Sequence, residues 1–166
     1  MKTERLNIKK FAPQDWQALK AIVNDFTRSE YAIYDMPFPT EDKEIKALAN
    51  VYSQAELFYA VWLGDVMIGY VCFHELGGSY DIGYVFRSDY HGKGYAYEAC
   101  TYLMAHLAKT RNVKEFTAGT ALKNTPSCKM LGKLGFALVG TEMLAFRKDE
   151  NGNDIAFEGG NFKKEV

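Results

Sequence analysis

The 166-residue sequence predicts an α/β fold (α+β, with a mixed sheet) in one domain, residues 1–166. Two periodicities carry this prediction. Short segments in which apolar and polar residues alternate indicate strands, and longer segments with apolar residues three or four positions apart indicate helices. The segments follow one another as β-α-α-β-β-β-α-β-α-β-β, and the fourth and fifth strands are each followed by a helical crossover. No repeat, linker or low-complexity tract interrupts them.

In the first half of the chain, turn and cap residues divide these segments. Pro13 opens a helix, Thr40 is placed to cap a second one, and Gly64 begins the tight turn of a hairpin. The first half is expected to contain strands at 5–11, 57–62 and 66–74 and helices at 13–26 and 40–52.

The second half ends in a helix with clear boundary residues and a hairpin. Thr125 is expected to cap this helix, Pro126 to be its first helical residue, and Gly135 to adopt the left-handed conformation after its end. The second half is expected to contain strands at 80–86, 114–120, 136–146 and 155–163 and helices at 94–110 and 125–134.

Composition and charge limit the partners, the cellular compartment and the metal sites that are expected for this chain. The formal net charge is -1, so the basic excess of a nucleic-acid-binding surface is missing. The N-terminus has no apolar signal core, and no apolar run is long enough to cross a membrane. Three cysteines, an odd number, fit buried free thiols in a reducing cytoplasm. The histidines and cysteines lack metal-ligand spacing, so no metal is expected.

The most informative segment is the glycine-bearing turn between the 80–86 strand and the 94–110 helix. A strand, a turn with Gly92 and Gly94, and a helix start together form an anion site, because unpaired main-chain N–H groups and the helix dipole converge there. A P-loop does not fit, since Gly94 follows Lys93. A dinucleotide fingerprint fits poorly, since Tyr97 stands where Gly or Ala is needed. From these residues alone, a turn that binds no ligand is equally possible.

The order of elements, together with this turn, resembles the GNAT acetyltransferase superfamily over essentially the whole chain. The family's acetyl-CoA motif, Q/R-x-x-G-x-G/A, corresponds to residues 91–96, with His91 in place of Gln or Arg. Four segments are similar to the branch that acetylates ribosomal-protein N-termini. They are Thr3-Glu4-Arg5-Leu6, the run 92–99 (GKGYAYEA), Asn124-x-x-Ser127 and Lys133-Leu134-Gly135-Phe136.

The resemblance implies a fold that binds acetyl-CoA as cosubstrate. In the family, the turn holds the CoA pyrophosphate and the strand before it lies along the pantetheine arm. An Asn and a Ser at the next helix start contact that arm and lie near the thioester sulfur. Carried onto this sequence, the cofactor-binding residues are Phe86, Arg87, His91, Gly92, Lys93, Gly94, Tyr95, Ala96, Asn124 and Ser127.

The reaction implied is direct attack of a primary amine on the thioester, without an acyl-enzyme. The candidates for the general base are Asp81 and Glu75, each of which is also compatible with a solvated charge at a strand end. A chain of water molecules is the alternative route for the proton. Many family members place a tyrosine acid where this chain has Leu131, so Ser127 is the nearest candidate acid. Main-chain N–H groups at 84–86 are expected to stabilise the oxyanion.

The acceptor pocket is expected to use the irregular segment 28–40, although a loop that covers the core and carries ordinary solvated charges fits the same residues equally well. Aromatic residues of this segment can wall a pocket, and Glu30 and Asp35 can meet a cation. The resemblance leaves open a peptide N-terminus or a small amine such as a polyamine, amino acid or aminoglycoside. The sequence is also compatible with a CoA-binding regulatory domain without catalysis or with a nucleotide-binding module. The chain is expected to be a monomer or homodimer.

Overall fold

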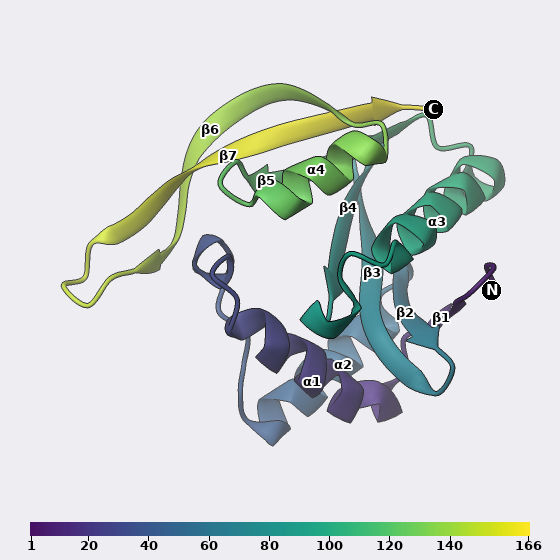
Figure 1. The fold of residues 1–166 in the computed structure, drawn as a ribbon, viewed down its shortest axis with the longest axis horizontal. Helices are drawn as coiled ribbons and strands as arrows, with labels where there is room; N and C mark the ends of the chain where they lie inside the picture. The colour runs from purple at the N-terminus through teal and green to yellow at the C-terminus, as the bar shows by residue number, and fades with distance from the viewer.

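The computed structural model describes residues 1–166, and its elements follow the predicted order (Figure 1). The strands are β1 (Asn7–Lys10), β2 (Phe58–Leu63), β3 (Val66–Leu76), β4 (Ser79–Phe86), β5 (Glu115–Ala121), β6 (Ala137–Lys148) and β7 (Asp154–Glu165). The helices are α1 (Trp16–Thr27), α2 (Asp42–Gln54), α3 (Tyr95–Arg111) and α4 (Thr125–Lys133). The predicted α/β fold with a mixed sheet is therefore confirmed. None of the helices combines the length and apolar character needed to span a bilayer.

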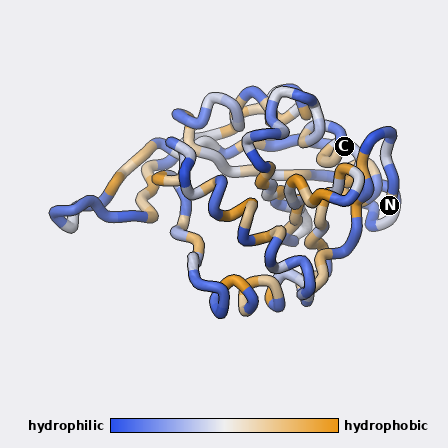
Figure 2. The backbone as a smooth tube through the Cα atoms, turned by 60° about the horizontal axis from the view of Figure 1, so that its bottom comes forward, coloured by the Kyte–Doolittle hydropathy of each residue, from blue (hydrophilic) through white to orange (hydrophobic).

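The seven strands form one sheet in the order β1-β2-β3-β4-β5-β7-β6. All neighbouring strands are antiparallel except β4 and β5, which are parallel. β7 lies between β5 and β6, so the last hairpin joins the sheet through its second strand. The hairpin reaches beyond the body of the protein, and its tip is hydrophilic (Figures 1 and 2).

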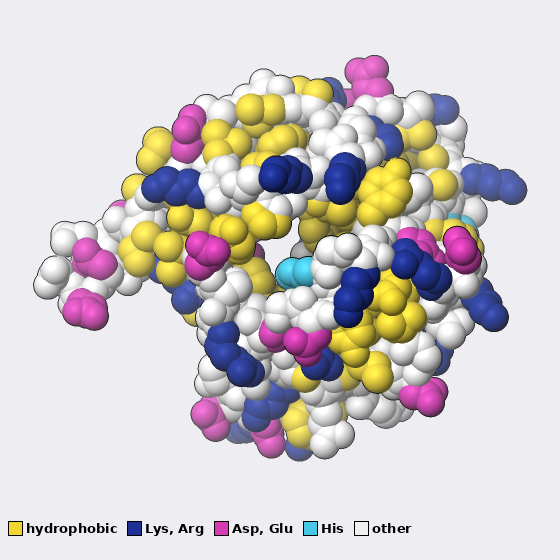
Figure 3. Space-filling model, in the orientation of Figure 1, with side chains coloured by type: hydrophobic (Ala, Val, Ile, Leu, Met, Phe, Trp, Pro, Cys, Tyr) yellow, Lys and Arg dark blue, Asp and Glu magenta, His cyan; other side chains and the backbone are white.

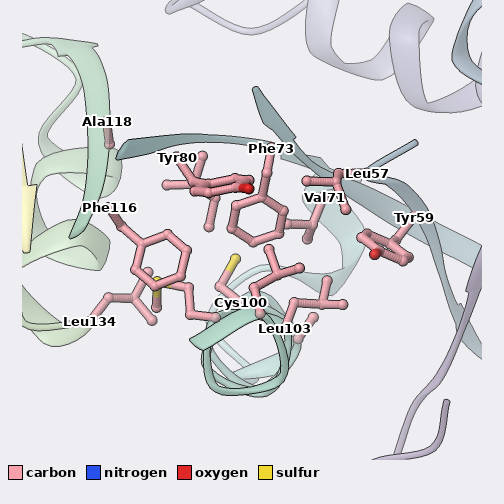
Figure 4. Packing of buried hydrophobic residues seen from close by; sticks show 14 of the residues in the cluster. Leu57, Tyr59, Val71, Phe73, Tyr80, Cys100, Leu103, Phe116, Ala118 and Leu134 are labelled. Atoms are coloured by element: carbon pink, nitrogen blue, oxygen red, sulfur yellow. The ribbon is translucent and has the colours of Figure 1, made fainter. Parts of the chain in front are cut away.

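Helices cover both faces of the sheet. α3 and α4 lie on one face and share a core with alternate strand residues, whereas α1 and α2 pack on the other face with the intervening ones. In Figure 4, Cys100 and Leu103 of α3 lie against Phe73 and Phe116 of the sheet. Along β4 the alternation gives Ile82 to the first core and Val85 to the second. Neither face of β4 is therefore an open surface.

One irregularity of the sheet positions the site. β4 and β5 pair only at Tyr80–Phe116 and Asp81–Thr117, and then diverge. From Ile82 to Phe86, β4 keeps β3 on one side and has no strand on the other. The main-chain polar groups on that edge therefore face a gap within the sheet, where buried groups need partners.

Two predicted helix caps were wrong. The cap of α2 is Glu41, whose carbonyl accepts the first helical N–H at 2.9 Å, rather than Thr40. The cap of α4 is Asn124, because its side-chain oxygen accepts the Ser127 N–H at 3.2 Å. Thr125 is instead the first helical residue. The left-handed Gly135 after α4 was predicted correctly, with φ of 87°.

Candidate active site

The gap between β4 and β5 opens into a cavity of about 610 Å³. Its walls come from the sheet (β2 to β5), the start of α4, α2, the segment between α1 and α2, and the β6–β7 hairpin. Figure 3 shows a hollow in the middle of this face of the molecule. We refer to this cavity as the cleft.

The glycine turn follows the end of β4, and none of residues 91–96 lines the cleft itself. Gly92 and Gly94 have φ of 72° and 82°, a region that L side chains avoid, and Gly94 is the N-cap of α3. The first hydrogen bond of α3 runs from Glu98 N–H to the Gly94 carbonyl, and the N–H groups of residues 92–97 donate to no protein acceptor. Six unpaired N–H groups at the positive end of a 17-residue helix form an anion site.

The N-terminal segment holds this turn in place. Glu98 accepts hydrogen bonds from Thr3 Oγ1 at 2.5 Å, from Arg5 N at 3.0 Å and from Arg5 Nε at 2.6 Å. Arg5 also donates from Nη1 to the Lys93 carbonyl at 2.9 Å and stacks over the Tyr95 ring. The opening Thr-Glu-Arg thus has a physical role, because two of its residues bind the first turn of α3.

His91 connects the turn to the strand. Its Nε2 lies 2.7 Å from the Phe86 carbonyl, and since a carbonyl only accepts, Nε2 carries the proton. Phe86 is buried in the core, and Arg87 pairs with Asp89 at 3.1 Å. Neither of these two side chains lines the cleft.

Lys93 and the preceding 3₁₀ turn, Ser88–Tyr90, are fixed by further contacts. Lys93 Nζ donates to the Asp89 carbonyl at 2.9 Å. Asp25 at the end of α1 accepts the Ser88 N–H and hydroxyl at 2.7 and 2.8 Å. Burial opposes ionisation of Asp25, but these two hydrogen bonds, together with the nearby side chains of His91 and Arg87, hold its pKa below the ordinary value.

Across the gap, the start of α4 presents Asn124 and Ser127 to the cleft. Asn124 uses Oδ1 as the helix cap, and its Nδ2 has no protein partner. The Ser127 hydroxyl lies 3.3 Å from the Tyr84 hydroxyl. Leu131, at the position of the family's tyrosine, is buried and lines the same wall.

Tyr84 is a candidate residue that sequence reasoning missed. Burial raises its pKa to about 12, against the opposing effect of the Ser127 hydrogen bond. The phenol therefore keeps its proton at neutral pH and can donate it. The alternation of β4 placed Tyr84 on the face of Ile82, but no local pattern indicated that its hydroxyl meets Ser127.

The two carboxylates expected as bases lie outside the cleft lining. Asp81 accepts a hydrogen bond from Thr117 Oγ1 at 2.9 Å. Burial raises the pKa of Asp81 above the ordinary value, although the Thr117 hydrogen bond and the nearby His74 act to lower it. Glu75 accepts from the Tyr80 hydroxyl at 3.2 Å and lines a separate hollow of about 400 Å³. His74 pairs with Asp81 in register across β3 and β4 and does line the cleft.

At the far end, the segment between α1 and α2 forms part of the wall, as its aromatic residues indicated. Tyr31, Tyr34 and Phe38 line the cleft, and so does Asp35, whereas Glu30 does not. Rings of the hairpin complete this wall, since Phe157 lies 5.2 Å from Tyr34 between ring centroids.

Comparison with known proteins agrees with this geometry. The family model described as "Acetyltransferase (GNAT) domain" matches residues 5–137. An uncharacterized N-acetyltransferase, YnaD, of Bacillus subtilis is 32% identical over 136 residues, which are 80% of this chain and 79% of that protein. The uS5-alanine N-acetyltransferase of Escherichia coli is 28% identical over 125 residues, 75% of this chain and 55% of that protein.

Solved structures show the same fold. A GNAT acetyltransferase from Bacillus anthracis superposes with a TM-score of 0.82 at 26% identity, covering 99% of this chain and 97% of that one. RimL, a ribosomal L7/L12 α-N-protein acetyltransferase in complex with CoA, has a TM-score of 0.82 at 17% identity and covers 99% and 96%. With a family model matched over most of its length, this chain belongs to the GNAT acetyltransferase family.

Proposed function

We propose that this protein transfers an acetyl group from acetyl-CoA directly to a primary amine bound in the cleft. The observation that carries the proposal is the row of unpaired N–H groups at residues 92–97, which follow the end of β4, the strand that diverges from β5 at the cleft. An anion site at one end and an aromatic pocket at the other fit a thioester cosubstrate and an amine acceptor.

The residues of the turn suit the CoA pyrophosphate. A side chain at Gly92 would project into open space, so a ligand can approach the main chain there. Gly92, Lys93, Gly94, Tyr95 and Ala96 bind phosphate oxygens through N–H groups, and His91 keeps the turn against β4. This main-chain mode accounts for a motif that tolerates His91 in place of Gln or Arg.

The pantetheine arm is proposed to lie along the unpaired edge of β4. Phe86 contributes its main-chain N–H there, since its carbonyl is bonded to His91. The main-chain groups of Arg87 are engaged elsewhere, because its N–H donates to the Ile68 carbonyl at 2.9 Å and its carbonyl accepts the Tyr90 N–H at 3.0 Å. Asn124 Nδ2, which has no protein partner, is free to donate to an amide oxygen of the arm. Acetyl-CoA supplies the activated acetyl thioester in this arrangement.

The amine must lose a proton to attack. An α-amino group, with a pKa of about 8, is roughly one-tenth neutral at pH 7, whereas a lysine-like amine near 10.4 is almost fully charged. We assign the base role to His74, which lines the cleft, and a supporting role to Asp81, its neighbour in register on β4. Glu75 faces a different hollow, so it has no part in this scheme.

Two further roles, stabilising the oxyanion and donating a hydrogen bond to the leaving thiolate, are assigned to groups of β4 and α4. On the unpaired edge of β4, the main-chain N–H groups of Tyr84 and Phe86 stabilise the oxyanion, because alternate residues such as Arg87 bond to β3 instead. The leaving thiolate resembles cysteine, with a pKa of about 8.5, so a neighbouring hydroxyl can donate a hydrogen bond to it. Tyr84 and Ser127 together supply that hydroxyl.

A thiol-release assay with acetyl-CoA tests the proposal. Peptides with free N-termini and small amines are offered in parallel panels, and acetyl transfer to at least one panel is expected. Similarity to the uS5-alanine enzyme favours the peptide panel, and turnover of small amines alone would exclude it. Calorimetric binding of acetyl-CoA with no turnover in either panel would instead indicate a regulatory CoA-binding domain.

The cellular location proposed for this activity is the cytoplasm. All three cysteines are unpaired, and Cys72 and Cys100 are buried. Free thiols persist in a reducing compartment, which supports this assignment.

A further inference from the structure

Charge is nearly absent from the wall of the cleft. Among its lining residues there is one carboxylate, Asp35, one histidine, His74, and no lysine, arginine or glutamate. The rest of the acceptor end is mainly aromatic. Its rings belong to Phe26, Tyr31, Tyr34, Phe38, Tyr52, Phe58, Tyr70, Phe146 and Phe157.

Asp35 is held in a fixed position at the mouth of this end. Its main-chain N–H donates to the Ala32 carbonyl at 3.2 Å, and its carbonyl accepts from Arg147 Nε at 2.8 Å. Its Oδ1 accepts the Met36 N–H at 2.9 Å, whereas Oδ2 has no protein partner. The residue is accessible to solvent, so one carboxylate oxygen is free for a ligand.

The charge of the Asp35 carboxylate acts on tyrosines of the aromatic wall. Partial removal of water from around the Asp35 carboxylate raises its pKa. The hydrogen bond from the Met36 N–H and the positive charge of Arg147 act in the opposite direction and lower it. The Asp35 charge in turn contributes to the raised pKa values of Tyr52 and Tyr70, although burial is the main cause for both. Its negative charge thus acts within the cleft as well as toward solvent.

The aromatic wall itself is closely packed. Tyr52 stacks on Phe58 with ring centroids 4.0 Å apart, and Tyr70 lies 4.9 Å from Phe58. These three rings largely cover one another, and Phe58 and Tyr70 are buried. The cleft-lining rings that remain accessible include Tyr31 and Tyr34. Accessible aromatic faces attract one cation and bury an apolar group, because the ring quadrupole is negative and the area is hydrophobic. A second or third ammonium group would lose water there without a carboxylate to replace it, which is costly.

We propose that the cleft selects a primary monoamine attached to an apolar or aromatic group, and that Asp35 binds its ammonium group through Oδ2. This inference rests on the function proposed above and narrows its acceptor. It disfavours polyamines and aminoglycosides, which carry several ammonium groups. The shared chemistry is one ammonium beside an apolar group, and it is present both in phenethylamine and in a peptide that begins with phenylalanine.

The test compares four probes with the wild-type protein and two variants. The probes are phenethylamine, a C-terminally amidated tripeptide beginning with phenylalanine, spermidine and kanamycin. We expect kcat/KM for one or both of the first two to exceed the values for spermidine and kanamycin. Which of the two is used distinguishes a small-molecule source from a protein N-terminus.

Asp35→Asn is expected to raise KM for the preferred monoamine about 10- to 100-fold, the range of a lost hydrogen bond to a charged group. KM for acetyl-CoA and the unfolding temperature should not change. Glu41→Gln is the matched control, because Glu41 follows the same segment and is exposed, with no side-chain hydrogen bond. It should leave both KM values unchanged.

Three results would overturn the inference. Preference for spermidine or kanamycin contradicts the selection of a monoamine, and an unchanged KM in Asp35→Asn contradicts the role of the carboxylate. In both cases acetyl transfer still occurs, so the proposed function stands. Acetyl-CoA binding without turnover of any probe removes the proposed function and this inference with it.

Discussion

Replacing Glu98 by Gln removes the charge that joins the N-terminal segment to the first turn of α3. The carboxylate accepts three hydrogen bonds, from Thr3 and twice from Arg5, and its side chain is 16% exposed. Hydrogen bonds to charged groups contribute about 1.5–3 kcal/mol each when shielded from water. The Arg5 side chain is 41% exposed, so its ion pair is screened and contributes less, about 0.5 kcal/mol.

Since the amide of Gln retains part of the hydrogen bonding, we expect a loss of about 2 kcal/mol in the free energy of unfolding. For a chain of this size that corresponds to a fall of about 4–8 °C in Tm, measured by circular dichroism at pH 7. Glu44→Gln is the control, because Glu44 also lies in the first turn of a helix but has no side-chain partner. Its Tm should fall by no more than about 2 °C, the effect of the helix dipole alone.

The pH dependence supplies a second check on the same pair of proteins. Burial opposes ionisation of Glu98, but its hydrogen bonds to Thr3 and Arg5 hold its pKa below the ordinary value. A lowered folded-state pKa stabilises the protein above the unfolded value, about 4.3, and this contribution is lost as pH falls through the folded value. The stability difference between wild type and Glu98→Gln should shrink below that pH. Equal losses in Glu98→Gln and Glu44→Gln at pH 7 would refute the reasoning.

Three further substitutions test the site. Gly94→Glu places a carboxylate in the anion site, at a residue with a left-handed φ of 82°. Calorimetry should show that the folded variant no longer binds CoA. An unchanged affinity for CoA would refute the assignment of the anion site. Tyr84→Phe should lower kcat about 10- to 100-fold in steady-state assays with KM for acetyl-CoA unchanged, whereas full activity would leave Ser127 as the only acid. With a peptide substrate, Asp81→Asn should lower kcat/KM about tenfold at pH 7 and less at pH 9, where most of an α-amino group is already neutral. A pH-independent loss would indicate a structural role instead.

The order and type of the elements were predictable because they depend on local periodicity. The strand and helix patterns are visible in short windows, and Gly135 marks the end of α4 through its left-handed φ. The insertion of β7 between β5 and β6 was not predictable, because it depends on which distant strands pair. The cap of α4 was misplaced by one residue since Asn124 and Thr125 are both suitable caps in sequence.

The features of the site also divide into those that local sequence predicts and those that depend on the fold. The turn around Gly92 and Gly94 was recognisable because a strand, a glycine turn and a helix start are consecutive in the chain. The proximity of Tyr84 to Ser127 and of His74 to the cleft depends on sheet register and on the divergence of β4 and β5. The sequence marks Asp35 as a charge in a loop, but its position as the one carboxylate that lines a largely aromatic cleft exists only in the folded protein.

The central claim is direct acetyl transfer from a CoA thioester to an amine in the cleft. Mass spectrometry of a single-turnover reaction, with protein in excess over acetyl-CoA and an active amine present, tests it most directly. Direct transfer predicts one acetylated amine for each CoA released and no acetyl group on the protein, including Cys128 beside Ser127. Acetylation of a cysteine before the product forms, or CoA release without acetylated amine, would contradict it.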